Sequence, residues 1–116
     1  MKNLIVILGP TASGKTHKAV ALAERLNTEI ISADSRQIYR GMDIGTGKDL
    51  EEYKNVPYHL IDICPAGYKY NLFEYLRDYQ AARDSILAKG NTPILCGGTG
   101  LYVEAVSYTH LTLPTI

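Results

Sequence analysis

The chain has 116 residues, and its twelve basic side chains balance its twelve acidic ones. This length supports one modest hydrophobic core, so we expect a single domain or part of one. The balanced charge argues against a broad nucleic-acid-binding surface, although a local basic patch is compatible with it. The longest apolar run is far shorter than the roughly 20 residues of a membrane-spanning helix. We therefore expect a cytoplasmic protein with no membrane association.

Four short apolar runs predict β-strands, at residues 4–8, 29–32, 58–63 and 92–96. Branched apolar side chains dominate these runs, which is typical of strands buried on both faces of a sheet. Cys64 and Cys96 lie beside or within two of the runs. We therefore expect reduced, buried thiols and not a disulfide framework.

Two helices are predicted between the strands. The first has apolar residues at helical spacing, namely Ala19, Leu22, Ala23 and Leu26. The second begins at Asn71, with Glu74 in the capping-box position, and ends at Gly90. Its predicted buried stripe consists of Leu72, Leu76, Tyr79, Ala82 and Ile86. Residues 41–54 are predicted as a glycine-rich loop. The alternation of elements predicts an α/β fold with a parallel sheet flanked by helices.

A phosphate-binding loop stands between the first predicted strand and the first predicted helix. Its G-x-x-x-x-G-K-[ST] pattern is formed by Gly9, Pro10, Thr11, Ala12, Ser13, Gly14, Lys15 and Thr16. A strand that turns through glycines into a helix directs backbone N–H groups and the positive helix end at one point. Lys15 adds a cation for a diphosphate or a nucleotide such as ATP, and the Thr16 hydroxyl is suited to Mg²⁺. The alternative is a glycine-rich turn without a ligand. The motif and its context together predict a P-loop NTPase-like fold.

Polar side chains follow the second predicted strand. Asp34 comes directly after it, and a carboxylate there can accept a proton or hold Mg²⁺ through water. The alternative role for Asp34 or Ser35 is to cap a helix. Arg36 and Gln37 can hold a phosphate or a base edge, although an exposed arginine is often only solvated.

Two further clusters have weaker signals. Tyr39 and Arg40 combine an aromatic ring with a cation, as nucleic-acid-binding proteins do. The run at residues 97–100, Gly-Gly-Thr-Gly, leaves room for a substrate to approach closely, and Thr99 supplies a hydroxyl. A plain glycine turn explains that run equally well. His59 lies within a predicted strand, where a structural role is commoner than a catalytic one.

The last ten residues abandon the preceding pattern. One reading frame of a transposase sequencing adapter encodes Val-Ser-Tyr-Thr-His-Leu-Thr-Leu-Pro-Thr, which matches residues 106–115. We therefore interpret residues 107–116 as a non-native read-through tail and residues 1–106 as the N-terminal part of the domain. The alternative is a genuine, poorly patterned C-terminal strand.

Four blocks of sequence closely resemble the tRNA dimethylallyltransferase family, also called the tRNA isopentenyltransferase family. The blocks are residues 9–16, 31–48, 59–62 and 97–102, and they keep the family's order and spacing. The second block is the most specific, because other phosphate-loop families lack it. The family's chain is much longer, so the resemblance implies a truncated sheet and a fragment that is inactive alone.

The resemblance implies prenyl transfer to the exocyclic amine of the tRNA adenosine next to the anticodon. The loop from Gly9 to Thr16 would hold dimethylallyl diphosphate, with Lys15 stabilising the leaving group and Thr16 binding Mg²⁺. Asp34 would be the general base. The tRNA would contact Asp34, Ser35, Arg36, Gln37 and Thr99. We expect a monomer.

Two other enzymes would share the loop and the sheet. One is a small-molecule or nucleotide kinase, which would transfer phosphate from ATP. The other is an adenylate prenyltransferase, which would modify a free nucleotide instead of tRNA. A fragment that binds phosphate without a reaction of its own is the non-enzymatic reading.

Overall fold

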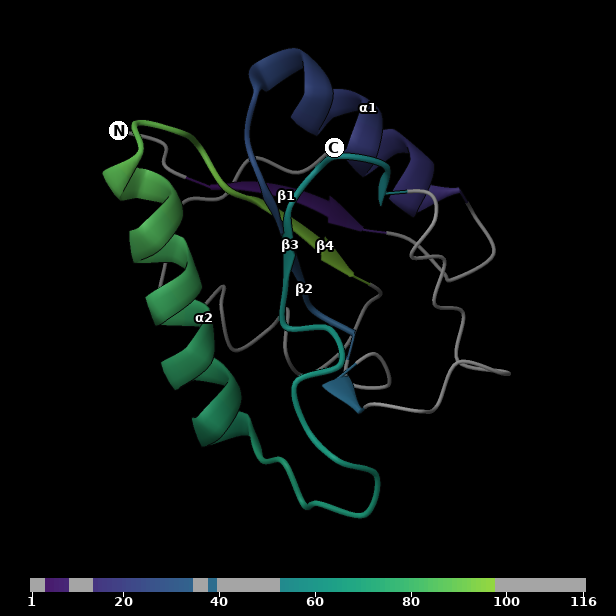
Figure 1. Cartoon of the computed structure of the whole chain (residues 1–116), viewed down its shortest axis with the longest axis vertical. Helices are drawn as coiled ribbons and strands as arrows, with labels where there is room; N and C mark the ends of the chain where they lie inside the picture. Colours follow the sequence, from purple (N-terminus) through teal and green to yellow (C-terminus); the bar gives the residue numbers. More distant parts are fainter. Residues whose placement is uncertain (1–3, 9–13, 35–37, 40–52, 98–116) are drawn as a thin grey trace.

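The protein is described here by a computed structural model, which covers residues 4–8, 14–34, 38–39 and 53–97. In chain order, its elements are β1 Ile5–Leu8, α1 Lys15–Leu26, β2 Ile30–Ser32, β3 Tyr58–His59, α2 Leu72–Ala88 and β4 Ile94–Gly97 (Figure 1). The loop predicted at 41–54 lies almost wholly outside the described residues. The predicted tail at 107–116 lies outside them altogether.

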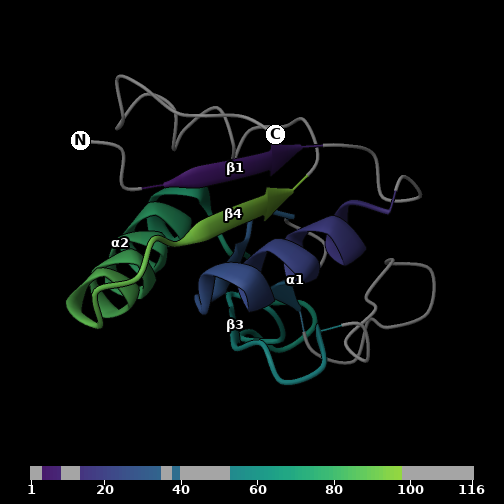
Figure 2. The ribbon, with the colours of Figure 1, turned by 90° about the horizontal axis from the view of Figure 1, so that it is seen from above.

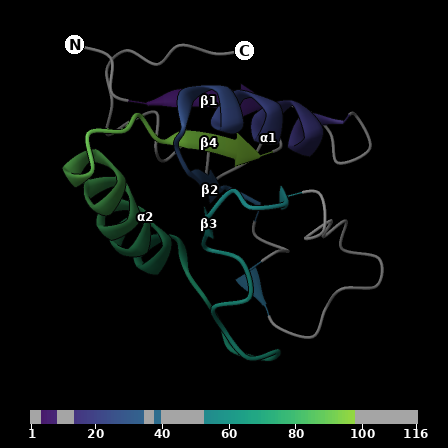
Figure 3. The ribbon, with the colours of Figure 1, turned by 45° about the horizontal axis from the view of Figure 1, so that its top comes forward.

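The strands form one parallel sheet, as the alternation of elements predicts, and their order in it is β1-β4-β2-β3 (Figure 3). β4 comes last in the chain but lies between β1 and β2. Its register pairs Ile94 with both Ile5 and Ile30. Because every strand runs the same way, all of their carboxyl ends lie along one edge of the sheet.

The two helices pack on opposite faces of the sheet (Figures 1 and 2). Alternate residues of β1, β2 and β4 supply the two cores, since successive side chains of a strand point to opposite faces. The core under α2 includes Val6, Ile31 and Leu95. The core under α1 takes their neighbours in sequence, which are Ile7, Ile30, Ile94 and Cys96. The sheet is therefore buried on both sides, as its apolar strands predict.

The buried stripe of α1 is shorter than predicted. Ala19 and Ala23 are buried and Leu22 packs against the core, but Leu26 is 47% exposed. Leu26 is the last residue of the helix, and the cap residue Asn27 has a left-handed φ of 54°. The chain therefore turns away before Leu26 can reach the sheet.

The start of α2 confirms the predicted capping box. The Glu74 N–H donates to Asn71 Oδ1 at 2.8 Å, and the Asn71 N–H donates to Glu74 Oε1 at 3.1 Å. The predicted stripe misses Tyr75, which is fully buried and whose hydroxyl donates to the Ser32 carbonyl at 3.0 Å. Leu72 and Leu76 are only partly buried and lie at the margin of the core. Gly90, with a φ of 79°, follows the end of α2.

The third strand is much shorter than the predicted run of residues 58–63. Leu60 and Asp62 have φ values of 66° and 59°, which are left-handed and incompatible with an extended strand. The chain turns there, and the Ile63 and Cys64 N–H groups both donate to the Ile38 carbonyl, at 2.8 and 3.1 Å. The prediction of a strand over residues 60–63 is therefore wrong.

Two further expectations from the sequence concern the cysteines and membrane-spanning helices. Cys64 and Cys96 are buried and neither is part of a disulfide bond, as predicted. Over the ranges that the structure describes, neither helix is long and apolar enough to cross a membrane.

Candidate functional site

The three strands that precede the sequence-predicted motifs in the chain end at one edge of the sheet. The register sets Leu8 beside Gly97 and Ser32 beside Cys96, so β1, β4 and β2 end at nearly the same level. The phosphate loop follows β1, Thr99 follows β4 and Asp34 follows β2. Neighbouring strands are about 4.8 Å apart, so β1 and β2 lie roughly 10 Å apart with β4 between them. In open α/β sheets, ligands bind at this edge.

The last residues of the predicted phosphate loop form the start of α1, where the backbone geometry suits an anion. Gly14 caps α1 with a left-handed φ of 79°, a conformation that other residues adopt only with strain. The Lys18 N–H donates to the Gly14 carbonyl at 3.2 Å, which closes the first helical turn. The N–H groups before it have no partner within a helix.

The charges in the first turn of α1 also favour an anionic ligand. The turn contains Lys15 and Lys18 and no acidic residue. Cations at a helix N-terminus oppose the helix dipole and cost stability. A bound anion would remove that cost, so the sequence of the turn favours an anionic ligand over a turn without one.

Gly97 holds the ends of β4 and β2 together. A Cβ on Gly97 would lie 2.8 Å from the Ala33 Cβ, and the Ala33 N–H donates to the Cys96 carbonyl at 2.9 Å. Ala33 therefore occupies the space beside Gly97. The interpretation that this glycine leaves room for a substrate is wrong. Asp34, which is half-buried, follows this contact directly, and its N–H donates to Ser32 Oγ at 3.3 Å.

A second polar cluster, which the sequence did not predict, lies at the opposite edge of the sheet. Glu29 precedes β2 and is 5% exposed. Its Oε1 lies 2.7 Å from His59 Nε2 and its Oε2 lies 2.6 Å from Lys89 Nζ. Burial raises the pKa of Glu29, but the hydrogen bonds from Lys89 and His59 outweigh burial and hold it below its ordinary value. His59 has the structural role that its strand position favoured.

Comparison with known families assigns the chain. The family profile described as IPP transferase matches residues 37–115, and the one described as isopentenyl transferase matches residues 2–56. The chain belongs to the IPP transferase family. The resemblance inferred from the four sequence blocks is thereby confirmed.

Individual relatives agree with this assignment. The chain is 65% identical to tRNA dimethylallyltransferase 2 of Bacteroides fragilis over 116 residues, which covers 97% of this chain and 38% of the relative. It is 69% identical over 107 residues to tRNA dimethylallyltransferase 1 of Porphyromonas gingivalis, covering 89% of this chain and 35% of that protein. The chain thus spans little more than a third of the length of these relatives.

Solved structures confirm the P-loop NTPase-like fold. The full-length tRNA isopentenylpyrophosphate transferase of Bacillus halodurans matches with a TM-score of 0.88 and 47% identity, over 94% of this chain and 36% of that one. A eukaryotic dimethylallyltransferase acting on tRNA matches with a TM-score of 0.84 and 32% identity, over 90% of this chain and 26% of that one.

The structure places only part of the site predicted for this IPP transferase. Asp34, Gly14 and Thr16 are described, and Thr16 is half-buried in the first turn of α1. The side chain of Lys15 lies outside the described part. So do whole residues of the predicted site, namely Gly9, Pro10, Thr11, Ala12, Ser13, Ser35, Arg36, Gln37 and Thr99. Their roles stay predictions. Across the described ranges, no group of three or more His, Cys, Asp or Glu side chains could hold a metal ion.

Proposed function

We propose that this chain is the donor-binding and base-bearing part of a tRNA dimethylallyltransferase. The whole protein would transfer a dimethylallyl group from dimethylallyl diphosphate to the exocyclic amine of the adenosine next to the anticodon. It would act as a monomer in the cytoplasm. The observation that supports the proposal is the shared level at which β1, β4 and β2 end, because the predicted phosphate loop follows β1 in the sequence and Asp34 follows β2.

The phosphate loop would hold the diphosphate of the donor. Breaking the allylic C–O bond leaves negative charge on the diphosphate and positive charge on the allyl group. Backbone N–H groups before Lys18 and the positive end of α1 would stabilise the negative charge as it develops. Lys15 would add a mobile cation to the same leaving group.

Magnesium fits the oxygen donors at this edge. The Thr16 hydroxyl belongs to the last residue of the phosphate-loop motif, and Asp34 supplies a carboxylate that can act through water. Such hard oxygen ligands, together with the oxygens of a diphosphate, suit Mg²⁺. When bound, the ion would offset the charge of the departing diphosphate.

Asp34 would act as the general base. The adenine amine is a poor nucleophile until it loses a proton. In the proposed step its nitrogen forms a bond to the allylic carbon, the C–O bond to the diphosphate breaks, and the amine proton passes to the Asp34 carboxylate. The separation of roughly 10 Å between β1 and β2 leaves room for the allyl group between the leaving group and the base.

The tRNA would contact residues beyond β2 and β4. We assign Ser35, Arg36 and Gln37 to one side of the target nucleotide and Thr99 to the other. Because the donor would lie at the sheet edge, the target base has to leave its stack to reach it.

A direct test compares donors and acceptors on purified full-length protein. We expect labelled dimethylallyl diphosphate to modify a tRNA anticodon stem-loop, to leave AMP unmodified, and to raise the melting temperature of the protein. ATP turnover without prenyl transfer would instead identify a kinase. Prenylation of AMP but not of RNA would identify an adenylate prenyltransferase.

A further inference from the structure

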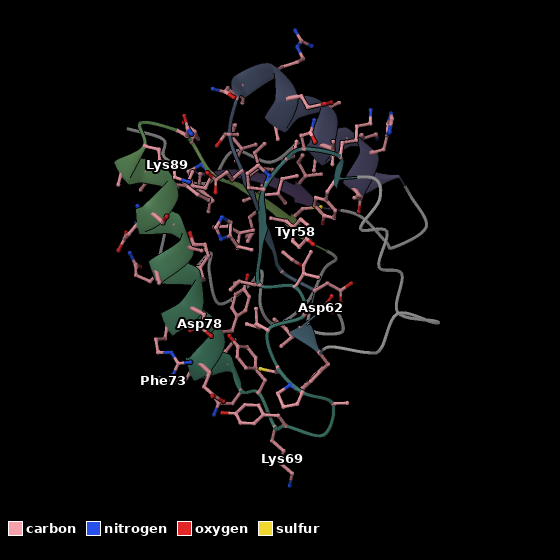
Figure 4. All side chains as sticks on the ribbon, in the orientation of Figure 1. Tyr58, Asp62, Lys69, Phe73, Asp78 and Lys89 are labelled. Atoms are coloured by element: carbon pink, nitrogen blue, oxygen red, sulfur yellow. The ribbon has the colours of Figure 1, made fainter. Side chains whose placement is uncertain are left out.

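A hollow of about 740 Å³ lies between α2 and the segment that follows β3. We call it the tyrosine hollow, after three of its lining residues. The side chains that matter here are Tyr58, Tyr68, Tyr70, Glu74, Arg77 and Asp78. In Figure 4, Asp78 on α2 faces the chain that runs from Tyr58 down to Lys69. Nothing in the proposed reaction uses this hollow.

The tyrosine hollow exposes apolar surface that the core does not use. In the described part of the chain, five large apolar side chains are exposed, and three of them line the hollow. These are Tyr58 at 40%, Ile63 at 40% and Tyr68 at 45%. A gathering of exposed rings next to polar groups is typical of a binding surface.

The carboxylates in the hollow are held as hydrogen-bond acceptors. The Tyr68 hydroxyl donates to Glu74, and the Tyr70 hydroxyl donates to Asp78 Oδ2 at 2.5 Å. The Tyr68 hydrogen bond lowers the pKa of Glu74. Burial raises the pKa of Asp78, but hydrogen bonds from Arg77 and Tyr70 lower it overall. Both groups therefore stay ionised near neutral pH and can accept from a ligand's N–H groups.

Cations lie at the margin of the hollow. The Arg77 side chain is 61% exposed although its Nε donates to Asp78 Oδ1 at 3.0 Å. Lys69 stands between two of the tyrosines in the sequence and is exposed. Stacking rings, acceptors and exposed cations are the three groups that bind an unpaired nucleotide by its face, its edge and its phosphate.

The tyrosine hollow is joined by hydrogen bonds to the chain that leaves the proposed catalytic edge. Ile38 and Tyr39 follow residues 34–37 directly. The Ile38 carbonyl accepts from the N–H groups of Ile63 and Cys64, and the Tyr39 hydroxyl accepts from the Tyr70 N–H at 3.3 Å. Two residues that follow Asp34 by four and five positions in the sequence therefore contact the segment that forms the wall of the hollow.

We propose that the tyrosine hollow receives an unpaired RNA base close to the nucleotide that is modified. The proposal rests on the proposed function, because it takes the substrate to be RNA. The base would stack on Tyr68 or Tyr58, and its amino group would donate to Asp78 or Glu74. A protein segment could use the same rings, but the continuity with residues 34–39 favours the RNA.

The test uses three variants of the full-length protein: Tyr68→Ala, Tyr68→Phe and Phe73→Ala. Phe73 is the matched control, because it is 78% exposed, lies on α2 and does not line the hollow. We expect Tyr68→Ala to weaken binding of an anticodon stem-loop by about tenfold, since one stacked base is lost. Tyr68→Phe keeps the ring and should bind within about twofold of the wild type, as should Phe73→Ala. Affinity for dimethylallyl diphosphate should not change.

A second measurement identifies the contact. Stem-loops that carry 5-iodouridine at each loop position in turn should crosslink to Tyr68 or Tyr58 from one position only. The subsite is refuted if Tyr68→Ala binds RNA as Phe73→Ala does, or if the wild type dimerises through these tyrosines. Prenyl transfer by the wild type distinguishes failure of the subsite from failure of the proposed function. If the wild type transfers normally and Tyr68→Ala does not weaken RNA binding, only the subsite is rejected. A wild type that neither binds RNA nor transfers the prenyl group rejects both.

Discussion

The two ends of β2 each carry a carboxylate, and the two have different surroundings. Glu29, before the strand, is 5% exposed, and its two oxygens are engaged by His59 Nε2 and by the Lys89 ammonium group. Asp34, after the strand, is half-buried and stands where the phosphate loop and β4 also end. In a parallel sheet the amino ends face one edge and the carboxyl ends the other.

The structural role of Glu29 and the proposed catalytic role of Asp34 go with their positions at opposite ends of the same strand. The hydrogen bonds from Lys89 and His59 stabilise the ionised form of Glu29 and lower its pKa, which makes it a poor proton acceptor. Glu29 is therefore suited to joining β2, β3 and the end of α2. Asp34 lies at the edge where such sheets bind ligands, so the same strand carries a stabilising group at one end and the proposed base at the other.

The largest effect should come from Asp34→Asn. Removing a general base lowers the rate of a proton-coupled step by about 10² to 10⁴. We expect prenyl transfer to fall by that factor in single-turnover assays, while RNA binding and thermal stability change little. Asp84→Asn, on the exposed face of α2, is the control. If Asp34→Asn turns over like that control, the base lies elsewhere.

Glu29→Gln should lower stability and leave prenyl transfer nearly unchanged, which is the reverse of the effect of Asp34→Asn. It leaves His59 and Lys89 without their charged partner at a buried site, which should lower the free energy of unfolding by about 2 kcal/mol. Urea denaturation followed by circular dichroism measures this change. Transfer per folded molecule should stay close to that of the wild type. A large loss of turnover with unchanged stability would mean that the two ends of β2 are not divided in this way.

Gly97→Ala should lower both the stability of the protein and its turnover. The new methyl group would lie 2.8 Å from the Ala33 Cβ, so the strands or the chain leading to Asp34 must shift. We expect a stability loss of about 1–3 kcal/mol, together with a loss of turnover beyond that of Glu29→Gln. Gly90→Ala, where a Cβ meets nothing within 4 Å but φ is 79°, controls for backbone strain alone. Equal turnover in the two variants would show that the contact does not position Asp34.

The smallest effect is the acid dependence of stability. The pKa of Glu29 in the folded protein lies below its ordinary value of 4.5. Its contribution is therefore fully present above pH 4.5 and is lost as the pH falls from there through the folded value. Glu74 and Asp78 also have lowered pKa values, so the wild type is compared with Glu29→Gln. The stability difference between them should shrink below pH 4.5. A constant difference would contradict the role of the ionised carboxylate.

Local patterns in the sequence predicted most of the fold. The apolar run of β1, the glycine at the start of α1 and the Asn71–Glu74 capping box act within a few residues, and each is confirmed. The shortening of β3 was missed, because the turn with left-handed Leu60 and Asp62 leads into hydrogen bonds from the Ile63 and Cys64 N–H groups to the Ile38 carbonyl, which is distant in the sequence. A leucine gives no signal of such a conformation, whereas an aspartate such as Asp62 adopts it more often than most residues do.

Contacts between distant residues could not be predicted. Glu29 reaches His59 and Lys89 across 30 and 60 positions, and no spacing rule links them. The only signal was a charged residue directly before the strand residues Ile30 and Ile31, which are buried. The position of β4 between β1 and β2, and the contact of Gly97 with Ala33 that follows, likewise required the assembled sheet. The motifs predicted which residues would gather at the site, but not what holds their strands in register.

The most direct test is a crystal structure of the full-length protein with dimethylallyl diphosphate. The account predicts the diphosphate against Gly14 and the start of α1, with the allylic carbon pointing toward β2 and the Asp34 carboxylate on the same side. A diphosphate bound at that place with the Asp34 carboxylate turned to the far side of β2, out of reach of any amine near the allylic carbon, would contradict it.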